Sequence, residues 1–268
     1  MSKLYLVATP IGNLGDMTIR ALETLKSVDV IACEDTRHTL PLLTHFDIKK
    51  PLISYYKHKE KEGAEKIISL LNEGKDVALV SDAGMPCISD PGSEVVKELL
   101  NRGYEYTVVP GASAVVSAIA LTGVDGSFSF IGFLPEKKKD ITRLLTPYKD
   151  IDTNLVFYVA PHDVEDTIKV LYDNLGDRPL YAVKEITKIH EKVIAGRLSG
   201  ITIENQKGEF VFVVGRPDGE KEEVSEDKLR FELSELIFGG MDKKTATKTV
   251  AEKYGISKNI VYKLSIDI

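Results

Sequence analysis

Short apolar runs alternate with amphipathic stretches through the first 120 residues of this chain. Runs of the length and composition of buried strands occupy 4–8, 29–32, 52–54, 77–80 and 106–109. Stretches with helical spacing occupy 18–27, 37–46, 60–72, 91–101 and the segment after Pro110. Strands that alternate with helices predict an α/β layered domain with a largely parallel sheet. In such sheets, ligands bind beyond the carboxyl ends of the strands.

A second unit begins near residue 127. Strands are expected at 128–133, 155–159, 180–184, 191–195 and 209–215, and helices at 140–147 and 164–174. The later strands are closely spaced, which favours antiparallel pairing and therefore a mixed sheet. After a polar linker at 216–223, three short helices are expected at 227–238, 243–253 and 257–264, the last two with helix-turn-helix spacing. We therefore expect domains at 1–122, 123–218 and 224–268.

Composition and charge narrow the classes of partner. A hydrophobic content of 43% and a charged content of 28% are those of an ordinary soluble globular protein. The apolar stretches are much shorter than a membrane span and no leader precedes the first strand, so we expect a cytoplasmic protein without a membrane partner. The formal net charge of −6 argues against indiscriminate coating of nucleic acid. Two basic stretches, 136–149 and 241–264, nevertheless suit one particular polyanion, unless they are only solvated surfaces.

Three loops follow predicted strands of the first unit, at 9–15, 81–92 and 110–114. The second reads SDAGMPCISDPG and is richer in Gly, Pro and Asp than a simple turn requires. None of the loops contains GxxxxGK[ST] or GxGxxG, which disfavours a ligand anchored by phosphates. A nucleoside-like ligand would need backbone amides and carbonyls, a carboxylate and small residues, all of which these loops offer. For any one loop alone, a plain chain reversal is the alternative.

A further loop, Cys33-Glu-Asp-Thr-Arg-His-Thr39, places two carboxylates, an arginine and a histidine at another predicted strand end. Such a group suits acid–base chemistry or the positioning of a polar substrate. An N-cap by Asp35 or Thr36 with neighbouring ion pairs explains the same residues equally well. The histidines and cysteines show no metal-ligand spacing, and no GxSxG elbow occurs, so we expect neither a metal site nor a serine hydrolase.

Four segments occur in a characteristic order: LYLVATPIGNLGDMTIRALETLKSVDVIACEDTRHT, VSDAGMPCISDPG, VVPGASA and FIGFLP. With LVFYVAPHD, KEITKIHEKVIAG and the C-terminal helices, they resemble the ribosomal RNA small-subunit methyltransferase I family of the tetrapyrrole-methylase superfamily. The resemblance implies an α/β protein with two αβα domains, a cleft between them and a small helical C-terminal extension. It also implies a homodimer that uses S-adenosylmethionine to methylate the 2′-hydroxyl of a cytidine ribose. The implied target lies in the decoding region of 16S rRNA, within the small ribosomal subunit.

The same resemblance implies site residues. The expected cofactor-binding residues are Pro10, Asp82, Ala83, Met85, Ser113, Ala114, Val159, Ala160 and Gly196. The expected RNA-binding residues are Arg37, Lys137, Lys138, Lys139, Lys243 and Lys244, and for Arg37 an ion pair with a carboxylate is the alternative. The general base stays open among Glu34, Asp35, His38, Lys184 and Glu185. Asp163 and Lys184 stand where the family commonly has arginine, which puts phosphate contacts at those two positions in doubt.

Two other functions stay open at this point. The first is methylation of a tetrapyrrole carbon, for which the CEDTRHT loop and the basic C-terminal helices have no obvious use. The second is a nucleotide sensor whose C-terminal helices bind DNA, which requires specific duplex binding by the last forty or so residues.

For the methyl transfer itself, the leaving thioether is already good, so the protein mainly has to align donor and acceptor.

Overall fold

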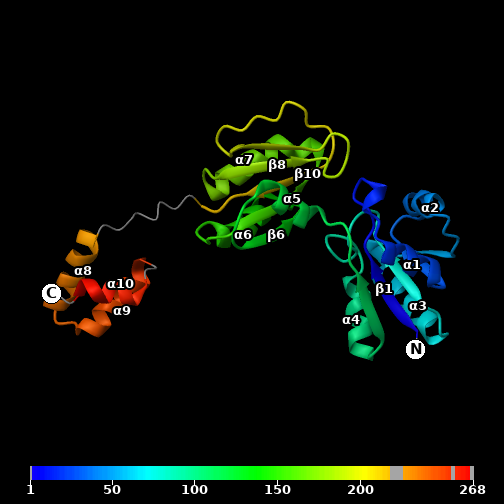
Figure 1. The fold of residues 1–268 in the computed structure, drawn as a ribbon, viewed down its shortest axis with the longest axis horizontal. Helices are drawn as coiled ribbons and strands as arrows, with labels where there is room; N and C mark the ends of the chain where they lie inside the picture. Colours follow the sequence, from blue (N-terminus) through cyan, green and yellow to red (C-terminus); the bar gives the residue numbers. More distant parts are fainter. Residues whose placement is uncertain (1, 218–225, 255–256, 266–268) are drawn as a thin grey trace. The chain divides into compact units, whose positions relative to one another are not determined.

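The computed structural model describes residues 2–217, 226–254 and 257–265 (Figure 1). The chain divides into two compact units, 1–217 and 218–268, and each is described by itself. The first unit contains two five-stranded sheets, one on either side of the boundary predicted near residue 122. The limits of the three predicted domains stay a prediction.

The first sheet is entirely parallel, as predicted, because each of its four strand pairings is parallel. Its order is β3-β2-β4-β1-β5, with strands β1 (Lys3–Val7), β2 (Val30–Cys33), β3 (Leu52–Ser54), β4 (Val77–Val80) and β5 (Glu105–Val109). The intervening helices are α1 (Ile19–Ser27), α2 (Thr36–His45), α3 (Glu60–Asn72) and α4 (Ser93–Arg102), with short 3-10 turns η1 (Leu14–Asp16) and η2 (Lys57–Lys59).

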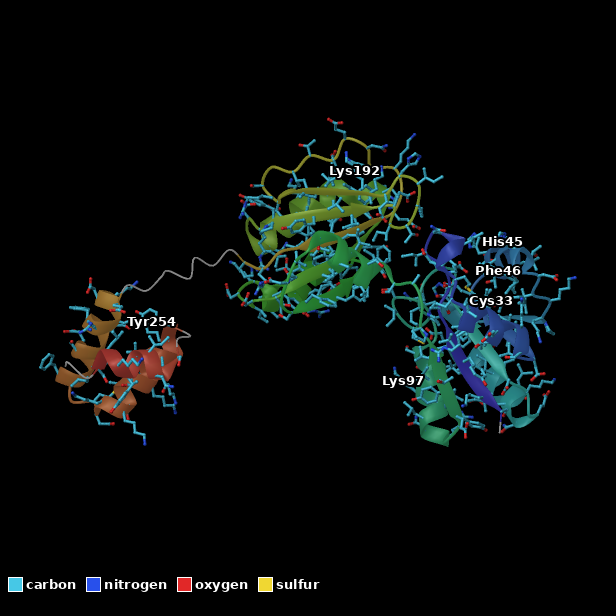
Figure 2. The ribbon with its side chains drawn as sticks, in the orientation of Figure 1. Cys33, His45, Phe46, Lys97, Lys192 and Tyr254 are labelled. Atoms are coloured by element: carbon cyan, nitrogen blue, oxygen red, sulfur yellow. The ribbon has the colours of Figure 1, made fainter. Side chains whose placement is uncertain are left out.

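Every residue of β2 and β4 is buried, because helices cover both faces of this sheet. Alternate side chains of a strand point to opposite faces, so Ile31 and Ala32 enter two different hydrophobic clusters. Cys33, at the end of β2, is a free and buried thiol in the interior of this layer (Figure 2).

The second sheet is mixed, which confirms the prediction. Its order is β6-β7-β10-β8-β9, with strands β6 (Phe128–Gly132), β7 (Asn154–Val159), β8 (Pro179–Lys184), β9 (Lys192–Arg197) and β10 (Phe210–Val214). Strands β6 and β7 are parallel, and the other three pairings are antiparallel. The segments beside the sheet are α6 (Lys138–Leu145), η3 (Thr146–Tyr148), η4 (Pro161–Asp163) and α7 (Val164–Leu175).

Helix α5 (Ala114–Thr122) follows the last strand of the first sheet but packs on the second (Figure 1). Its buried residues Val115 and Ala118 contact a cluster that includes Val156 of β7 and Val211 of β10. Helices α6 and α7 cover the opposite face of the second sheet. The start of α5 therefore lies where the first sheet ends and the second begins, which is the position of the site described below.

The described residues of the C-terminal unit form three short helices, as predicted: α8 (Glu226–Phe238), α9 (Lys243–Tyr254) and α10 (Lys258–Ser265). They pack around Leu233, Val250 and Val261, which are fully buried. At the end of α9, the Lys253 ammonium lies 5.2 Å from the ring centre of Tyr254 (Figure 2). Of the residues between α9 and α10, 255–256 lie outside the described part of the chain. Within the described part, no helix combines the length and the apolar character needed to cross a membrane.

Candidate active site

The three loops that follow β1, β4 and β5 meet at one edge of the first sheet. Thr9 and Gly84 form an isolated antiparallel bridge, in which the Thr9 N–H donates to the Gly84 carbonyl at 2.9 Å and the reverse bond measures 3.1 Å. The Ala8 N–H donates to the Val109 carbonyl at 3.1 Å. A Cβ on Gly111 would lie 2.9 Å from the Ala8 side chain, so glycine is required for this close approach. The three loops therefore gather at one rim of the sheet, as expected of loops that follow parallel strands.

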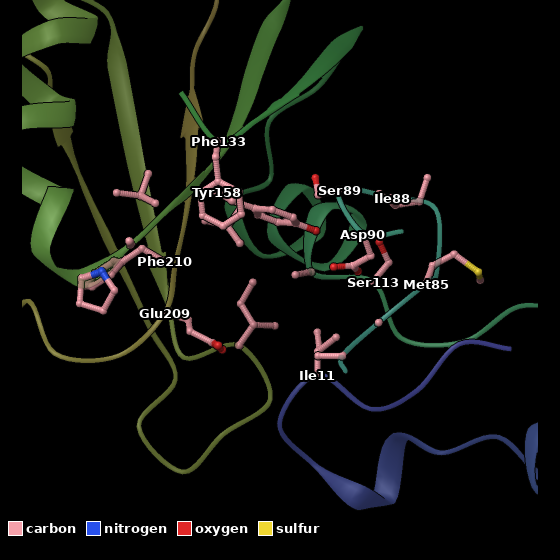
Figure 3. A pocket seen from close by; sticks show the side chains of 18 residues that line it. Ile11, Met85, Ile88, Ser89, Asp90, Ser113, Phe133, Tyr158, Glu209 and Phe210 are labelled. Atoms are coloured by element: carbon pink, nitrogen blue, oxygen red, sulfur yellow. The ribbon is translucent and has the colours of Figure 1, made fainter. Parts of the chain in front are cut away.

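A cavity of about 390 Å³ lies beside these loops and extends to the ends of β7 and β10 in the second sheet (Figure 3). Its lining is mostly apolar, with a few polar side chains, which is typical of sites for small molecules and cofactors. The residues that line it are Ile11, Ala83, Gly84, Met85, Ile88, Ser89, Asp90, Ser113, Ala114, Phe133, Tyr158, Val159, Ala160, Pro161, Ile186, Glu209, Phe210 and Val211.

Helix α5 begins at this cavity. Ser113 is its N-cap residue, in an extended conformation, but its side chain makes no capping hydrogen bond. The first backbone N–H groups of a helix have no partner within the helix, so they are available to a ligand at this wall. The partial positive charge of a helix N-terminus favours an anionic group there.

The loop from Ser81 to Gly92 has a strained backbone. Cys87 and Ser89 have φ angles of +71° and +68°, a region that residues with a side chain rarely adopt. Gly92, with φ +137°, ends the loop, and a Cβ there would lie 2.6 Å from the Cys87 sulfur. Backbone strain of this kind concentrates at functional sites, where the surrounding structure enforces it.

On the opposite wall, an ion-pair network holds the segment that follows β8. The Lys188 ammonium lies 2.9 Å from Glu185 Oε1 and 2.8 Å from Glu209 Oε2. Glu185, at φ +50°, also accepts the Glu209 backbone N–H at 2.8 Å. The Lys188 stem covers Gly12 of the first loop, since a Cβ on Gly12 would lie 2.5 Å from Lys188 Cγ. This network therefore connects the two sides of the cavity.

Comparison with known proteins places this geometry in a family. The family model described as tetrapyrrole (corrin/porphyrin) methylases matches residues 3–202. Curated relatives named ribosomal RNA small subunit methyltransferase I include one from Bacillus subtilis, 42% identical, with 98% of this chain and 93% of the relative covered. The relative of that name from Synechocystis is 40% identical, with 100% and 99% covered. The chain belongs to the ribosomal RNA small subunit methyltransferase I family.

Solved structures support the fold of this methyltransferase. The methyltransferase CobJ superposes with a TM-score of 0.62 at 18% identity, covering 81% of this chain and 95% of its own. A uroporphyrin-III-C-methyltransferase from Thermus thermophilus gives 0.58 at 23% identity, covering 84% and 99%. At these identities the likeness concerns the fold alone. The predicted tetrapyrrole-methylase architecture with a helical C-terminal segment is confirmed.

The structure brings most of the expected cofactor-binding residues of this methyltransferase together. Those that line the cavity are Ala83, Met85, Ser113, Ala114, Val159 and Ala160. Pro10 and Asp82 are immediate neighbours of lining residues but are not part of the lining. Gly196 lies on β9, which borders β8, and pairs there with Leu180. Ile186, two residues beyond the end of β8, lines the cavity, whereas the Leu180–Gly196 pair lies six residues before it, so the structure places Gly196 away from the cavity.

The five candidates for the general base lie outside the cavity lining, and four of them are engaged elsewhere. Asp35 accepts hydrogen bonds from the Arg37 backbone and side chain, and this holds its pKa down at about 2. His38 Nδ1 lies 3.0 Å from Asp82, which raises the histidine's pKa. Of the two N-cap candidates, Asp35 caps α2. This loop therefore has the structural role that the sequence left open.

The two candidates from the second sheet have structural contacts as well. Lys184 is 8% exposed, and its ammonium donates to the Asn205 carbonyl at 2.9 Å and lies 5.6 Å from the Phe210 ring centre. In Glu185, burial raises the carboxyl pKa, but hydrogen bonds from the Glu209 backbone and Lys188 outweigh it and lower the pKa overall. Of the three carboxylate candidates, Glu34 alone has a raised pKa, caused by burial and by the nearby charge of Asp82.

Several cavity residues were not expected from the sequence. Asp90, Tyr158 and Glu209 are the ionisable side chains that line the cavity. Asp90 lies in the SDPG part of the loop at 81–92, so the sequence already indicated that it lies near the ligand site. Tyr158 and Glu209 belong to strand ends of the second sheet, where only the fold shows that they face the first sheet's loops. Within the described residues, no cluster of His, Cys, Asp and Glu suited to a metal ion is present.

The expected RNA-binding residues are mostly exposed. Lys137, Lys138 and Lys139 lie at the start of α6. The Arg37 guanidinium, 86% exposed, pairs with Asp35 at 2.7 Å. In the C-terminal unit, the Lys243 ammonium lies 3.3 Å from the Ser265 carbonyl, whereas Lys244 borders a shallow groove of about 470 Å³. The groove residues are Lys244, Thr245, Thr247, Lys248, Lys258, Asn259 and Tyr262.

Proposed function

We propose that this chain transfers a methyl group from S-adenosylmethionine to the 2′-hydroxyl of a cytidine ribose in 16S rRNA. The observation that carries the proposal is the cavity formed by the three loops of the first sheet and the strand ends of the second, in a chain that belongs to the ribosomal RNA small subunit methyltransferase I family. We further propose that the small ribosomal subunit is the substrate and that the enzyme acts in the cytoplasm as a homodimer.

The cavity suits S-adenosylmethionine. Its volume of about 390 Å³ lies within the range of cofactor sites, roughly 300–1,000 Å³. Ile11, Ala114 and Val211 offer apolar surface to a nucleoside, and the start of α5 offers backbone N–H groups to the carboxylate of the methionine portion. When bound, the cofactor supplies an electrophilic methyl group on a sulfonium centre. The protein's part is to hold donor and acceptor in line and to exclude water.

A second groove offers a place for the acceptor nucleotide. It has a volume of about 770 Å³ and shares Phe133, Tyr158, Val159 and Ala160 with the cavity. Phe133 is 59% exposed, and its ring centre lies 5.5 Å from that of Tyr158. Exposed aromatic rings stack on nucleic-acid bases that have left a helix. A base on Phe133 would bring its ribose to the wall that the groove and the cavity share.

The basic surfaces suit the rRNA backbone. Lys138 borders the second groove, and the C-terminal groove combines lysines with the exposed ring of Tyr262. Lysine ammonium groups bind phosphate as point charges, and an aromatic ring adds a stacking surface. These features favour a polyanion over a small macrocycle, although the solved neighbours CobJ and uroporphyrin-III-C-methyltransferase share the fold.

The test uses purified protein, methyl-labelled S-adenosylmethionine and small subunits from a strain that lacks the modification. Nucleosides from the recovered rRNA are examined by mass spectrometry, and we expect labelled 2′-O-methylcytidine. Ser113→Trp should abolish the product, because the larger side chain fills the cavity. Val116 lies on the same helix but is 60% exposed and does not line the cavity, so Val116→Trp should leave the product unchanged. A protein that binds the cofactor but methylates neither subunits nor naked rRNA would contradict the proposal and favour a small-molecule acceptor.

A further inference from the structure

One carboxylate in the cavity has no part in holding the fold. Asp90 lines the cavity and is partly buried. Among residues 2–217, 226–254 and 257–265, no group donates a hydrogen bond to its carboxylate or forms an ion pair with it. Its backbone lies between Ser89, at φ +68°, and the Pro91-Gly92 turn, so the strained loop fixes where this side chain points.

Glu209, the other acidic side chain in the cavity lining, differs from Asp90 in its exposure and in having an ion-pair partner. Glu209 is 78% exposed, and its carboxylate pairs with Lys188 at 2.8 Å. Tyr158, on the opposite wall, reaches toward Asp90 (Figure 3). Burial raises the pKa of the Tyr158 phenol, and the negative charge of Asp90 raises it further, so this hydroxyl keeps its proton. Asp90 is therefore the one acidic side chain of the described cavity wall that is free to accept a proton from a bound substrate.

We propose that Asp90 is the general base of the methyl transfer and removes the proton from the acceptor 2′-hydroxyl. This inference rests on the proposed function and deepens it. The acceptor oxygen forms a bond to the methyl carbon with its lone pair, while the pair of the breaking S–C bond stays on sulfur. The hydroxyl proton goes to Asp90, whose carboxylate becomes a neutral carboxylic acid.

The charges around Asp90 suit this role. Burial raises its pKa to about 6, and the negative charges of Glu34 and Asp82 contribute, whereas Lys57 opposes the shift. A base with a pKa near the working pH removes a proton more effectively than an ordinary carboxylate and is still ionised at pH 7. The loop also contacts Glu60 of α3, which accepts the Gly92 N–H at 3.1 Å. Burial raises the pKa of Cys87, within the loop, to about 11, so this thiol keeps its proton at neutral pH and is no competing base.

The first experiment compares Asp90→Asn and Asp90→Glu with the wild type. We expect kcat on small subunits to fall by about 100-fold or more in Asp90→Asn, the range typical of a lost general base, and to recover partly in Asp90→Glu. The affinity for S-adenosylhomocysteine, measured by calorimetry, should stay within about threefold of the wild-type value. Asp47→Asn, an equally small change at an 86% exposed carboxylate, is the matched control and should leave both quantities unchanged.

The second experiment measures proton binding in the protein without substrate. With 13C-labelled aspartate, the Asp90 carboxyl should titrate near pH 6, and its signal should be absent from Asp90→Asn. Glu34→Gln removes a like charge and should lower that pKa, whereas Lys57→Met removes an opposite charge and should raise it. The acidic limb of the wild-type pH–kcat profile should follow both shifts and should disappear in Asp90→Asn.

Three results would contradict the proposed role of Asp90. If Asp90→Asn kept kcat within threefold and instead weakened S-adenosylhomocysteine binding tenfold or more, Asp90 would be a ligand for the cofactor. If the carboxyl titrated near pH 4 irrespective of Glu34, the electrostatic argument would be wrong. A wild-type protein that methylated no rRNA would overturn the proposed function, and with it this role, and the wild-type control distinguishes that case from the first two.

Discussion

The loops after β2 and β4 carry similar residues but differ in their chemistry. Asp35, in the first, receives hydrogen bonds from the Arg37 backbone and guanidinium, and its pKa falls to about 2. Asp90, in the second, lies half-buried with no hydrogen-bond donor among the described residues, and its pKa rises to about 6. The two strands are adjacent in the sheet, so the loops start from the same edge. The lesson is that local hydrogen bonds and solvation, not residue type, separate a structural carboxylate from a candidate base.

The largest expected effect is a loss of cofactor affinity, caused by a substitution in the loop after β4 that fills the cavity. Gly84 has φ +78°, and a Cβ there would lie 3.3 Å from Ile11 Cγ2, at the cavity wall. We expect Gly84→Val to weaken S-adenosylhomocysteine binding by about 10- to 100-fold, because overpacking a filled site costs roughly 1–3 kcal/mol. Calorimetry measures the affinity.

Gly74→Val is the matched control for backbone strain. Gly74 has φ +81° but open space around its Cβ position, so valine should disturb folding there without affecting binding. Equal loss of affinity in both variants would mean that backbone strain, and not the cavity, explains the first result.

Asp90→Asn and Asp35→Asn should change the free energy of unfolding at pH 7 in opposite directions. The folded protein raises the pKa of Asp90 from 3.8 to about 6, so it binds this proton more tightly than the unfolded chain does. The free energy of unfolding therefore falls as pH rises from about 4 to about 6. Asp90→Asn cannot ionise and should be more stable than the wild type at pH 7, by at most about 3 kcal/mol. Denaturant unfolding at pH 4 and pH 7 measures the difference, which should vanish at pH 4.

Asp35→Asn should have the opposite sign. The pKa of Asp35 is lowered from 3.8 to about 2, so its ionised form stabilises the fold above about pH 4, and that contribution is lost as pH falls through about 2. The variant loses the ion pair with Arg37 and should melt at a lower temperature than the wild type at pH 7. If Asp35→Asn and Asp90→Asn changed the stability at pH 7 in the same direction, the proposed difference between the two carboxylates would be wrong.

The smallest effect concerns the contact that joins the two loops. Asp82 pairs with His38 Nδ1 at 3.0 Å and accepts the Asp35 backbone N–H at 3.3 Å. Its hydrogen bond and charge raise the pKa of His38, so Asp82→Asn should lower that pKa toward its ordinary value. Titration of the His38 ring protons by NMR measures the shift. An unchanged pKa would show that the loops titrate independently.

The elements of the fold were largely predictable because their patterns are local. The ranges 60–72 and 77–80 match α3 and β4, since buried runs and helical spacing fix them without tertiary information. The predicted and observed helix ends differ where backbone geometry decides them. Helix α4 begins at Ser93, after Gly92, and not at Pro91 as predicted. The packing of α5 on the second sheet was not predictable, because its sequence is apolar on nearly every side.

The sequence by itself determined the layered α/β architecture, the family and the loops that form the site, because motif order and hydrophobic period are properties of neighbours along the chain. Only the tertiary structure decided which carboxylates are engaged and which are free. Asp35 and Asp90 are both Asp in loops after buried strands, and 55 residues separate them. Their difference depends on Arg37 beside one, and on burial at the cavity wall near Glu34 and Asp82 for the other. Solvation and charge depend on distances in space, and those exist only in the folded protein.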